Sequence, residues 1–235
     1  VVSIAFDPLS RWVAFVNDES DVFVWPLAGL KANGRKTMPP RVLPGGKGVA
    51  RCVAIDPQSR YIATGGETEV CVWSIAALDR APKILRSQNG EVTCIGFAPD
   101  GERLAVGTIN GCVWFIDLTD GGVTSPLHFH ENAVNALACD ASGSLLASAG
   151  NNGVRIWQRN RSQDEPCLLL RFNPPKADGH TIASNLDSTD DYNLDRQIRW
   201  LAEGCEDGTL RVVALAVPNL VTTFQAAGTR SIVRV

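Results

Sequence analysis

One short stretch of the chain holds the residue types that could form a hydrolytic centre. His130, Ser148 and Asn151 lie close together in sequence. A serine hydrolase needs a serine nucleophile, a histidine that activates it and a group that orients the histidine. No G-x-S-x-G turn, which presents the serine in many such enzymes, occurs in the sequence. We therefore expect no catalytic residue and no enzyme activity, and a hydrolase is the least favoured alternative.

A second candidate is the basic segment from residue 26 to residue 51. It has no acidic residue, and its cations are Lys31, Arg35, Lys36, Arg41, Lys47 and Arg51. Such a segment could bind phosphate, nucleic acid or an acidic protein. The other interpretation is a solvated connector, because glycine and proline recur in it and residues 45–48 lack the spacing of a phosphate-binding loop. We favour the connector and keep phosphate or nucleic-acid recognition as the alternative function.

A third candidate is the acidic segment from residue 173 to residue 196, where Asp190 and Asp191 precede Tyr192. Long loops on a rigid scaffold commonly carry binding specificity. Calcium is the metal to consider, but the segment lacks the ligand spacing of a calcium loop and its closing glutamate. We interpret it as a loop that could contact a partner, and not as a metal site.

Metal, cofactor and disulfide chemistry find little support elsewhere. The chain has three histidines and seven cysteines, and no two cysteines have C-x-x-C spacing. An odd number of cysteines within apolar runs is typical of buried thiols in a reducing compartment. We expect no metal and no cofactor, and a cytoplasmic location.

The overall charge and hydropathy exclude further classes of partner. A formal net charge of −3 gives no general field that would attract nucleic acid or an anionic membrane. No apolar run approaches the roughly 18 residues of a membrane-spanning helix, and the first residues lack the basic start of a signal peptide. We expect protein partners, no nucleic acid and no membrane; whether a small molecule binds is left open.

These candidate residues lie in a repeated pattern of short apolar strands. Residues 133–158 contain three such strands, separated by a polar turn and by an Asn-Asn-Gly turn, and the third strand ends at Trp157. Residues 1–26, 49–75 and 91–118 repeat this pattern, and a looser copy has strands at about 180–186, 197–203 and 208–214. Further apolar segments supply a fourth strand to each copy, at 41–43, 83–86, 124–129, 167–172 and 220–224. Successive units of this length, each with three to four strands, predict a β-propeller.

The copies resemble WD40 repeats over essentially the whole chain. That family uses a histidine before the first strand, a serine or threonine in the second, an aspartate in the second turn and a closing tryptophan. The matching residues here are His130, Ser148, Asn151 in place of the aspartate, Trp157, Trp25, Trp73 and Asp207. The resemblance implies that these residues are structural and form buried hydrogen-bond networks.

Trp114 departs from this pattern, because the equivalent position is charged in two other copies, at Arg155 and Arg211. An exposed tryptophan at this position would be an anchor for a partner. The alternative is that the ring packs against the neighbouring unit. The residues alone leave both open.

The resemblance also implies an architecture and a function. We expect an all-β WD40-type propeller region over residues 1–235, with about five four-stranded blades in units of about 1–48, 49–90, 91–132, 133–179 and 180–228. Residues 229–235 would begin a sixth unit, so we expect a part of a larger propeller, of perhaps seven blades. The function implied is a noncatalytic scaffold, or a sensor or regulatory domain, that binds proteins within a larger multidomain protein.

Overall fold

The structure is a computed structural model, and it describes the backbone of 20 strands and a short 3-10 helix at Ile75–Ala77. The described residues are 1–27, 39–44, 48–87, 89–124, 127–128, 130–139, 143, 145–150, 152–158, 167–172, 179–185, 200–205, 209–214 and 221–225. Some of these residues have a described backbone but no described side chain. They are residues 127, 158, 167–172, 179–185, 200–205, 209, 211, 213–214 and 221–225.

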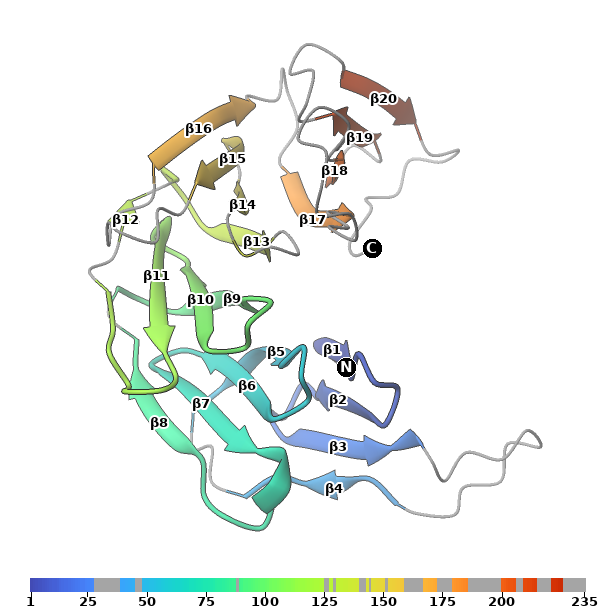
Figure 1. Cartoon of the computed structure of the whole chain (residues 1–235), viewed down its shortest axis with the longest axis vertical. Helices are drawn as coiled ribbons and strands as arrows, with labels where there is room; N and C mark the ends of the chain where they lie inside the picture. The colour runs from blue at the N-terminus through green and yellow to red at the C-terminus, as the bar shows by residue number, and fades with distance from the viewer. Residues whose placement is uncertain are drawn as a thin grey trace, which may run out of the picture. The chain divides into compact units, whose positions relative to one another are not determined.

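The strands form five four-stranded antiparallel sheets in chain order (Figure 1). Sheet one contains β1 (Ser3–Phe6), β2 (Trp12–Val16), β3 (Val22–Pro26) and β4 (Arg41–Val42). Sheet two contains β5 (Ala50–Ile55), β6 (Tyr61–Gly66), β7 (Glu69–Ser74) and β8 (Lys83–Arg86). Sheet three contains β9 (Val92–Phe97), β10 (Arg103–Thr108), β11 (Cys112–Asp117) and β12 (Leu127–His128).

Sheet four contains β13 (Val134–Cys139), β14 (Leu145–Gly150), β15 (Gly153–Gln158) and β16 (Cys167–Phe172). Sheet five contains β17 (Gly179–Asn185), β18 (Trp200–Cys205), β19 (Thr209–Ala214) and β20 (Val221–Gln225). The predicted all-β architecture of four-stranded blades is therefore confirmed. The predicted strand at 229–235 lies outside the described residues.

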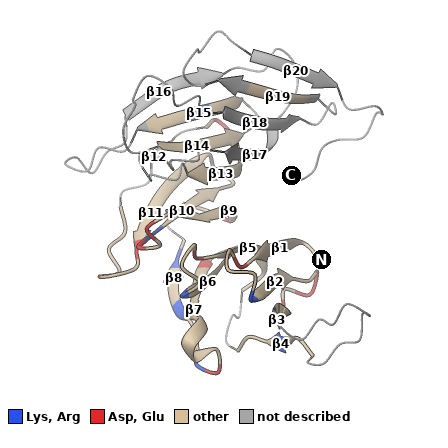
Figure 2. Cartoon of the chain, turned by 45° about the vertical axis from the view of Figure 1, so that its right-hand side comes forward, with Lys and Arg blue, Asp and Glu red and all other residues tan. Residues whose placement is uncertain are grey.

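The chain divides into two compact units. Unit 1 comprises Val1–Ile109 and Trp114–Pro126, and unit 2 comprises Asn110–Val113 and Leu127–Val235. In unit 1 the first strands β1, β5 and β9 lie beside one another, and in unit 2 β13 lies beside β17. Among the described residues, Lys, Arg, Asp and Glu lie mainly at strand ends, in turns and on β8 (Figure 2).

Two apolar cores hold unit 1 together, each formed between two sheets. The first joins sheets one and two and includes Ala14, Val24, Ile62 and Trp73. The second joins sheets two and three through side chains such as Val70, Leu104 and Trp114, together with Cys52 and further valines. Both faces of sheet two are therefore covered, and its inner strands β6 and β7 consist of nearly continuous buried residues.

The turns between the first and second strands of four sheets share one residue with positive φ. Ser10, Ser59, Gly101 and Gly143 occupy equivalent positions, and all have positive φ, between 55° and 68°. A residue other than glycine is uncommon in this region of backbone conformation. The repeat therefore determines the turn geometry even where its sequence changes from Pro-x-Ser to Pro-Asp-Gly.

Candidate partner-binding surface

Sheet four contains a buried hydrogen-bond network centred on Ser148. The Ser148 hydroxyl oxygen lies 2.8 Å from Nε2 of His130 and accepts a hydrogen bond of 3.2 Å from Nε1 of Trp157. Ser148 is fully buried, and His130 and Trp157 are nearly so. Unpaired polar groups would be costly at this depth, so the network fixes the positions of all three side chains.

The fourth described member of the network is Asn152, whereas the sequence predicted the adjacent Asn151. Its side-chain amide lies 2.7 Å from Nδ1 of His130. With the amide nitrogen facing the ring, Asn152 donates to Nδ1, and its oxygen accepts from Arg155 at 3.1 Å and from the backbone of Glu131 at 3.3 Å. Gly150 pairs with Gly153 across the hairpin, which leaves two residues in the turn, and the second of them reaches the histidine. Asn151 lies outside the described residues.

The β1–β2 and β5–β6 turns each contain a buried carboxylate that the sequence analysis did not identify. Asp7 accepts hydrogen bonds from the backbone and Nε of Arg11, at 2.9 and 3.2 Å. Asp56 accepts the same two hydrogen bonds from Arg60, at 2.9 and 3.0 Å. Both aspartate side chains have no exposed area, and the hydrogen bond to Asp56 raises the pKa of Arg60. Each pair is thus a charge-assisted brace within its turn.

Each brace also reaches the next sheet of unit 1. Nη2 of Arg11 donates to the Ser59 carbonyl oxygen at 3.4 Å, and Nη2 of Arg60 donates to the Asp100 carbonyl oxygen at 2.9 Å. Gln58 adds a hydrogen bond of 2.6 Å to the carbonyl oxygen of Pro99. The arginines therefore join equivalent turns of neighbouring sheets.

The aspartate and arginine of each brace belong to a short pattern that repeats in the sequence. The pattern Asp-Pro-x-Ser-Arg occurs at residues 7–11 and again at residues 56–60. In sheet three the positions of the aspartate and the arginine hold Ala98 and Glu102, so the two members of the pair change together. An acid and a base four residues apart across a tight turn are close enough to form an ion pair.

The opposite ends of these strands carry a polar groove on sheet two. It encloses about 470 Å³ and is lined by Glu67, Thr68, Glu69, Arg86, Ser87 and Gly90. Glu67 is exposed, whereas Oε2 of Glu69 is buried and has no hydrogen-bond partner among the described residues. A buried carboxylate oxygen of this kind favours a ligand that can donate a hydrogen bond or supply positive charge.

An acidic turn of sheet one lies beside the groove. Ser20 of the β2–β3 turn and Glu69 line one small cavity of about 20 Å³. The same turn carries Asp18, Glu19 and Asp21, all of them exposed. The nearby Arg51 forms an ion pair with Glu91. This end of unit 1 therefore has two carboxylates and Arg86 in the groove and three more carboxylates on the β2–β3 turn, and we call it the acidic end.

The described residues show no metal site and no membrane-spanning helix. They contain no group of three or more His, Cys, Asp or Glu side chains able to hold a metal ion. No helix in this part of the chain has the length and apolar character needed to cross a bilayer.

Two family models match the chain. The model of the WD domain, or G-beta repeat, matches residues 38–74, and that of the anaphase-promoting complex subunit 4 WD40 domain matches residues 71–140. These matches cover sheets two and three, and the network of sheet four has the histidine, serine and tryptophan of the same repeat. The chain belongs to the WD40-repeat family. Its sheets are WD40 blades, and the resemblance seen in the sequence is confirmed.

Several proteins are similar to this WD40 chain. The WD repeat-containing protein SL1-17 of Schistosoma mansoni is 30% identical over 154 residues, which are 65% of this chain and 48% of that protein. A chromatin assembly factor 1 subunit FAS2 homolog of Oryza sativa subsp. japonica is 33% identical over 117 residues, 43% of this chain and 23% of that protein.

A guanine nucleotide-binding protein subunit beta of Arabidopsis thaliana is 29% identical over 103 residues, which are 41% of this chain and 27% of that protein. The chain spans less than half the length of each of these three relatives.

The other closing tryptophans of the WD40 repeats have different environments. Trp73 is almost completely buried, and its Nε1 donates to the Pro44 carbonyl oxygen at 2.9 Å. Its partner is therefore the backbone of the connector before sheet two, and not a serine hydroxyl as in sheet four. Trp25 is only half-buried at the equivalent position of sheet one. Asp207 lies outside the described residues.

The prediction that Trp114 is an exposed anchor for a partner is wrong. Its side chain is fully buried, in the core between sheets two and three. The ring packs with residues such as Val70 and Val72 of the neighbouring sheet, and its Nε1 has no hydrogen-bond partner among the described residues. Of the two interpretations left open by the sequence, the structure shows packing against the neighbouring blade.

Of the remaining predicted partner-binding residues, the structure describes only Arg41. Its side chain is exposed on β4 and donates to Asp79, which lies between the 3-10 helix and β8, at 2.9 Å. Arg41 is therefore already paired with an acid of the same unit. The other candidates lie outside the described residues: Lys31, Arg35, Lys36, Asp190, Asp191 and Tyr192.

The five cysteines with described side chains form no disulfide. Burial raises the pKa of Cys71 to about 11 and also raises the pKa of Cys94. Such thiols remain protonated near neutral pH and are poor nucleophiles. Cys112 is buried with its sulfur 3.1 Å from Nδ1 of His128, directly opposite on β12.

Proposed function

We propose that this WD40 region is a noncatalytic scaffold or regulatory domain, and that it binds a protein partner through the acidic end of unit 1. The family membership carries the general proposal. Two of the similar proteins are named as subunits, and one matching family model is named for a subunit of a complex. A role in assembling proteins is consistent with those names.

The acidic end supports a particular kind of partner. Glu67 and the unpaired Glu69 oxygen lie in the groove with a single cation, Arg86. The β2–β3 turn adds three exposed carboxylates, those of Asp18, Glu19 and Asp21. Complementary charge favours association and specificity, and a rim charge acts mainly on the association rate and its salt dependence. The expected partner is therefore a protein segment rich in lysine and arginine. The described cysteines are reduced, which supports a cytoplasmic location as part of the same proposal.

Affinity purification with charge-reversed variants tests this function. Wild-type protein, Glu67→Lys and the matched control Glu102→Lys are used as baits in an extract of the source cells, and recovered proteins are identified by mass spectrometry. Glu102 lies in the β9–β10 turn, does not line the groove, and is also exposed. We expect a partner whose recovery falls severalfold with Glu67→Lys and with added salt, and is unchanged with Glu102→Lys.

Two other results would contradict the proposal. Equal recovery of every protein by all three baits would remove the acidic end as the binding surface. Salt-dependent binding of nucleic acid that is lost on charge reversal at Arg35 and Lys36 would instead favour the basic segment.

A further inference from the structure

Sheet two has the closing tryptophan of the repeat but lacks the buried network of sheet four. Strand pairing places Thr64 and Trp73 at the positions of Ser148 and Trp157. In sheet two, Nε1 of Trp73 donates to the Pro44 carbonyl oxygen and not to the hydroxyl of Thr64. The tryptophan hydrogen bond of the network is therefore made elsewhere in this sheet.

The histidine of the network is also missing from sheet two. His130 lies four residues before the first residue of β13, and the residue four positions before β5 is Gly46. Glycine has no side chain that could contact the Thr64 hydroxyl. That hydroxyl therefore takes part in neither of the side-chain hydrogen bonds that the Ser148 hydroxyl makes.

A small cavity lies at this point of sheet two. It encloses about 20 Å³, and its lining includes Thr64, Trp73, Ser20, Gly48 and Glu69. A cavity of this volume holds about one water-sized group. Oε2 of Glu69 is buried and has no hydrogen-bond partner among the described residues. The cavity thus brings a buried carboxylate oxygen together with a hydroxyl that the network does not use.

The electrostatic field in the cavity is negative. Cys71 also lines the cavity, and burial, together with the charge of Glu69, raises the pKa of this thiol to about 11. Arg86 lies opposite Glu69 on β8, but its side chain is exposed and forms no ion pair with Glu69. Among the described residues no cation pairs with the buried oxygen, so the cavity favours a positively charged donor.

The cavity adjoins the polar groove of the acidic end. Glu69 lines both the cavity and the groove. Ser20 and Gly48 are half-buried and Val49 is 39% exposed, so the cavity lies close to the surface. A side chain from a segment bound in the groove can therefore reach the Glu69 carboxylate from outside.

We propose that this cavity binds a lysine ammonium group of the partner, with Glu69 and Thr64 as its acceptors. The inference rests on the proposed function, because it takes a basic segment as bound at the acidic end. An ammonium group is a compact charge with three donors, whereas a guanidinium group is a wide planar fork that a water-sized cavity does not admit. The acidic end therefore selects lysine over arginine at one position of the segment.

A pair of peptides tests this selection. Hexalysine and hexaarginine, both with blocked ends, are titrated into the protein by calorimetry at one salt concentration. We expect hexalysine to bind about threefold more tightly or better, although arginine normally makes the stronger contacts with carboxylates. Glu69→Gln removes the charge and Thr64→Val removes the hydroxyl, and each variant should lose the preference for hexalysine.

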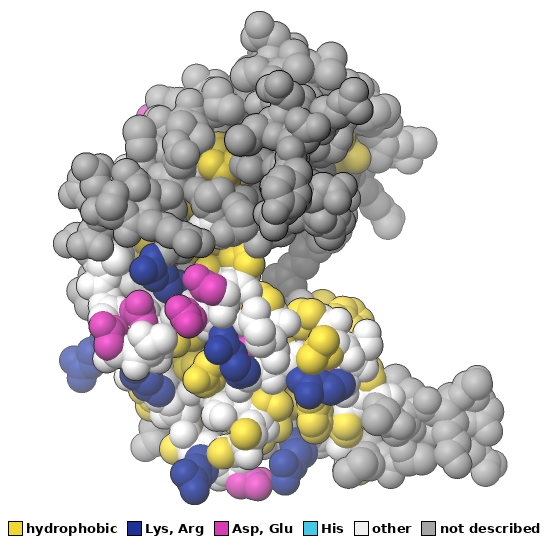
Figure 3. Space-filling model, viewed as in Figure 1, with side chains coloured by type: hydrophobic (Ala, Val, Ile, Leu, Met, Phe, Trp, Pro, Cys, Tyr) yellow, Lys and Arg dark blue, Asp and Glu magenta, His cyan; other side chains and the backbone are white. Residues whose placement is uncertain are grey.

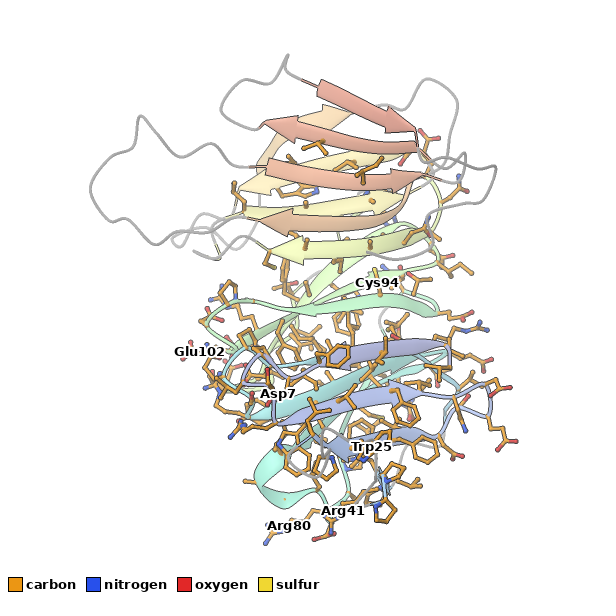
Figure 4. All side chains as sticks on the ribbon, turned by 90° about the vertical axis from the view of Figure 1, so that its right-hand side faces the viewer. Asp7, Trp25, Arg41, Arg80, Cys94 and Glu102 are labelled. Atoms are coloured by element: carbon orange, nitrogen blue, oxygen red, sulfur yellow. The ribbon has the colours of Figure 1, made fainter. Side chains whose placement is uncertain are left out.

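Glu102→Gln is the matched control for the charge change. Glu102 is exposed in the β9–β10 turn, at the opposite end of the strands from the groove (Figure 4). The face of unit 1 at that end has Lys and Arg side chains among Asp and Glu side chains (Figure 3). This variant should keep the wild-type preference for hexalysine.

The outcomes separate this inference from the proposed function. Equal affinity for the two peptides, with both weakened in Glu67→Lys, would keep the acidic end as the binding surface and overturn the lysine site. Binding of neither peptide would overturn both.

Small cations give a measurement that needs no peptide. Methylammonium chloride should shift the backbone amide NMR signals of Gly48 and Glu69, and tetramethylammonium chloride, whose cation is too large for the cavity, should not. Equal responses to the two salts would overturn the lysine site. Lys47→Gln should melt at the wild-type temperature; a loss of stability that disappears in the Glu69→Gln background would show that a lysine of the chain itself fills the cavity, and would also overturn the proposal.

Discussion

Nη2 of Arg60 donates a hydrogen bond of 2.9 Å to the carbonyl oxygen of Asp100, so a side chain of one blade holds the equivalent turn of the next. The same arginine is held by the buried carboxylate of Asp56. The Arg11 and Asp7 pair repeats this arrangement one blade earlier. The junctions of unit 1 are thus joined by polar contacts at the turns as well as by their apolar cores.

Replacement of the buried acid should weaken this junction. We expect Asp56→Asn to lower the free energy of unfolding by about 2 kcal/mol, because a charge-assisted hydrogen bond is lost and Arg60 loses its ionic partner. Urea denaturation measures the change. Asp18→Asn is the matched control, since Asp18 is exposed in the β2–β3 turn, and it should change stability by less than about 0.5 kcal/mol. Equal effects of the two substitutions would show that the brace contributes nothing to stability.

Gly101 is expected to be intolerant of a side chain. It has φ of +63°, and a Cβ at this position would overlap the Asp56 carboxylate, the Arg60 guanidinium and the Gln58 amide. We expect Gly101→Ala to cost about 2–4 kcal/mol, from backbone strain and displacement of the brace. Gly121→Ala is the control, because its φ is also positive but its Cβ would meet only the flexible end of Lys83. If both variants lost the same stability in a denaturation experiment, backbone strain alone would explain the result.

The network of sheet four should depend on its serine. Ser148→Ala leaves Nε2 of His130 and Nε1 of Trp157 without their shared partner in a buried site. We expect a loss of about 2 kcal/mol in the free energy of unfolding. A double-mutant cycle with His130→Ala should give a coupling energy of about 1 kcal/mol or more. Additive effects would mean that the two residues act independently.

Stability should fall at alkaline pH, in part because of Cys71. The pKa of this thiol is about 11 in the folded protein and 9.0 in an unperturbed thiol, so the folded state retains a proton that the unfolded state loses. Its contribution is complete below pH 9 and is lost as the pH rises towards 11. Urea denaturation between pH 8 and pH 11 should therefore show a smaller decline for Cys71→Val than for wild type. Identical slopes would place the Cys71 pKa near its ordinary value.

The repeat positions of Trp73 and Trp157 were predictable because they depend on local pattern. Short apolar strands, tight turns and a recurring closing residue all lie within about 26 residues, and each copy supports the others. A local pattern could not decide which residue of the β14–β15 turn contacts His130. Two adjacent asparagines are equivalent in sequence, and only the pairing of Gly150 with Gly153 decides that Asn152 contacts His130.

The sequence by itself determined the all-β repeat, the four strands of each blade and the identity of the family, because strand and turn preferences act over a few residues. The tertiary structure decided the environment of each side chain. Trp114 is buried because sheet two covers it, and Phe6, at an equivalent face, is exposed because no sheet of unit 1 covers it. Arg60 finds Asp100 across 40 residues of sequence. Such contacts join residues far apart in the chain, and they exist only once the blades have stacked.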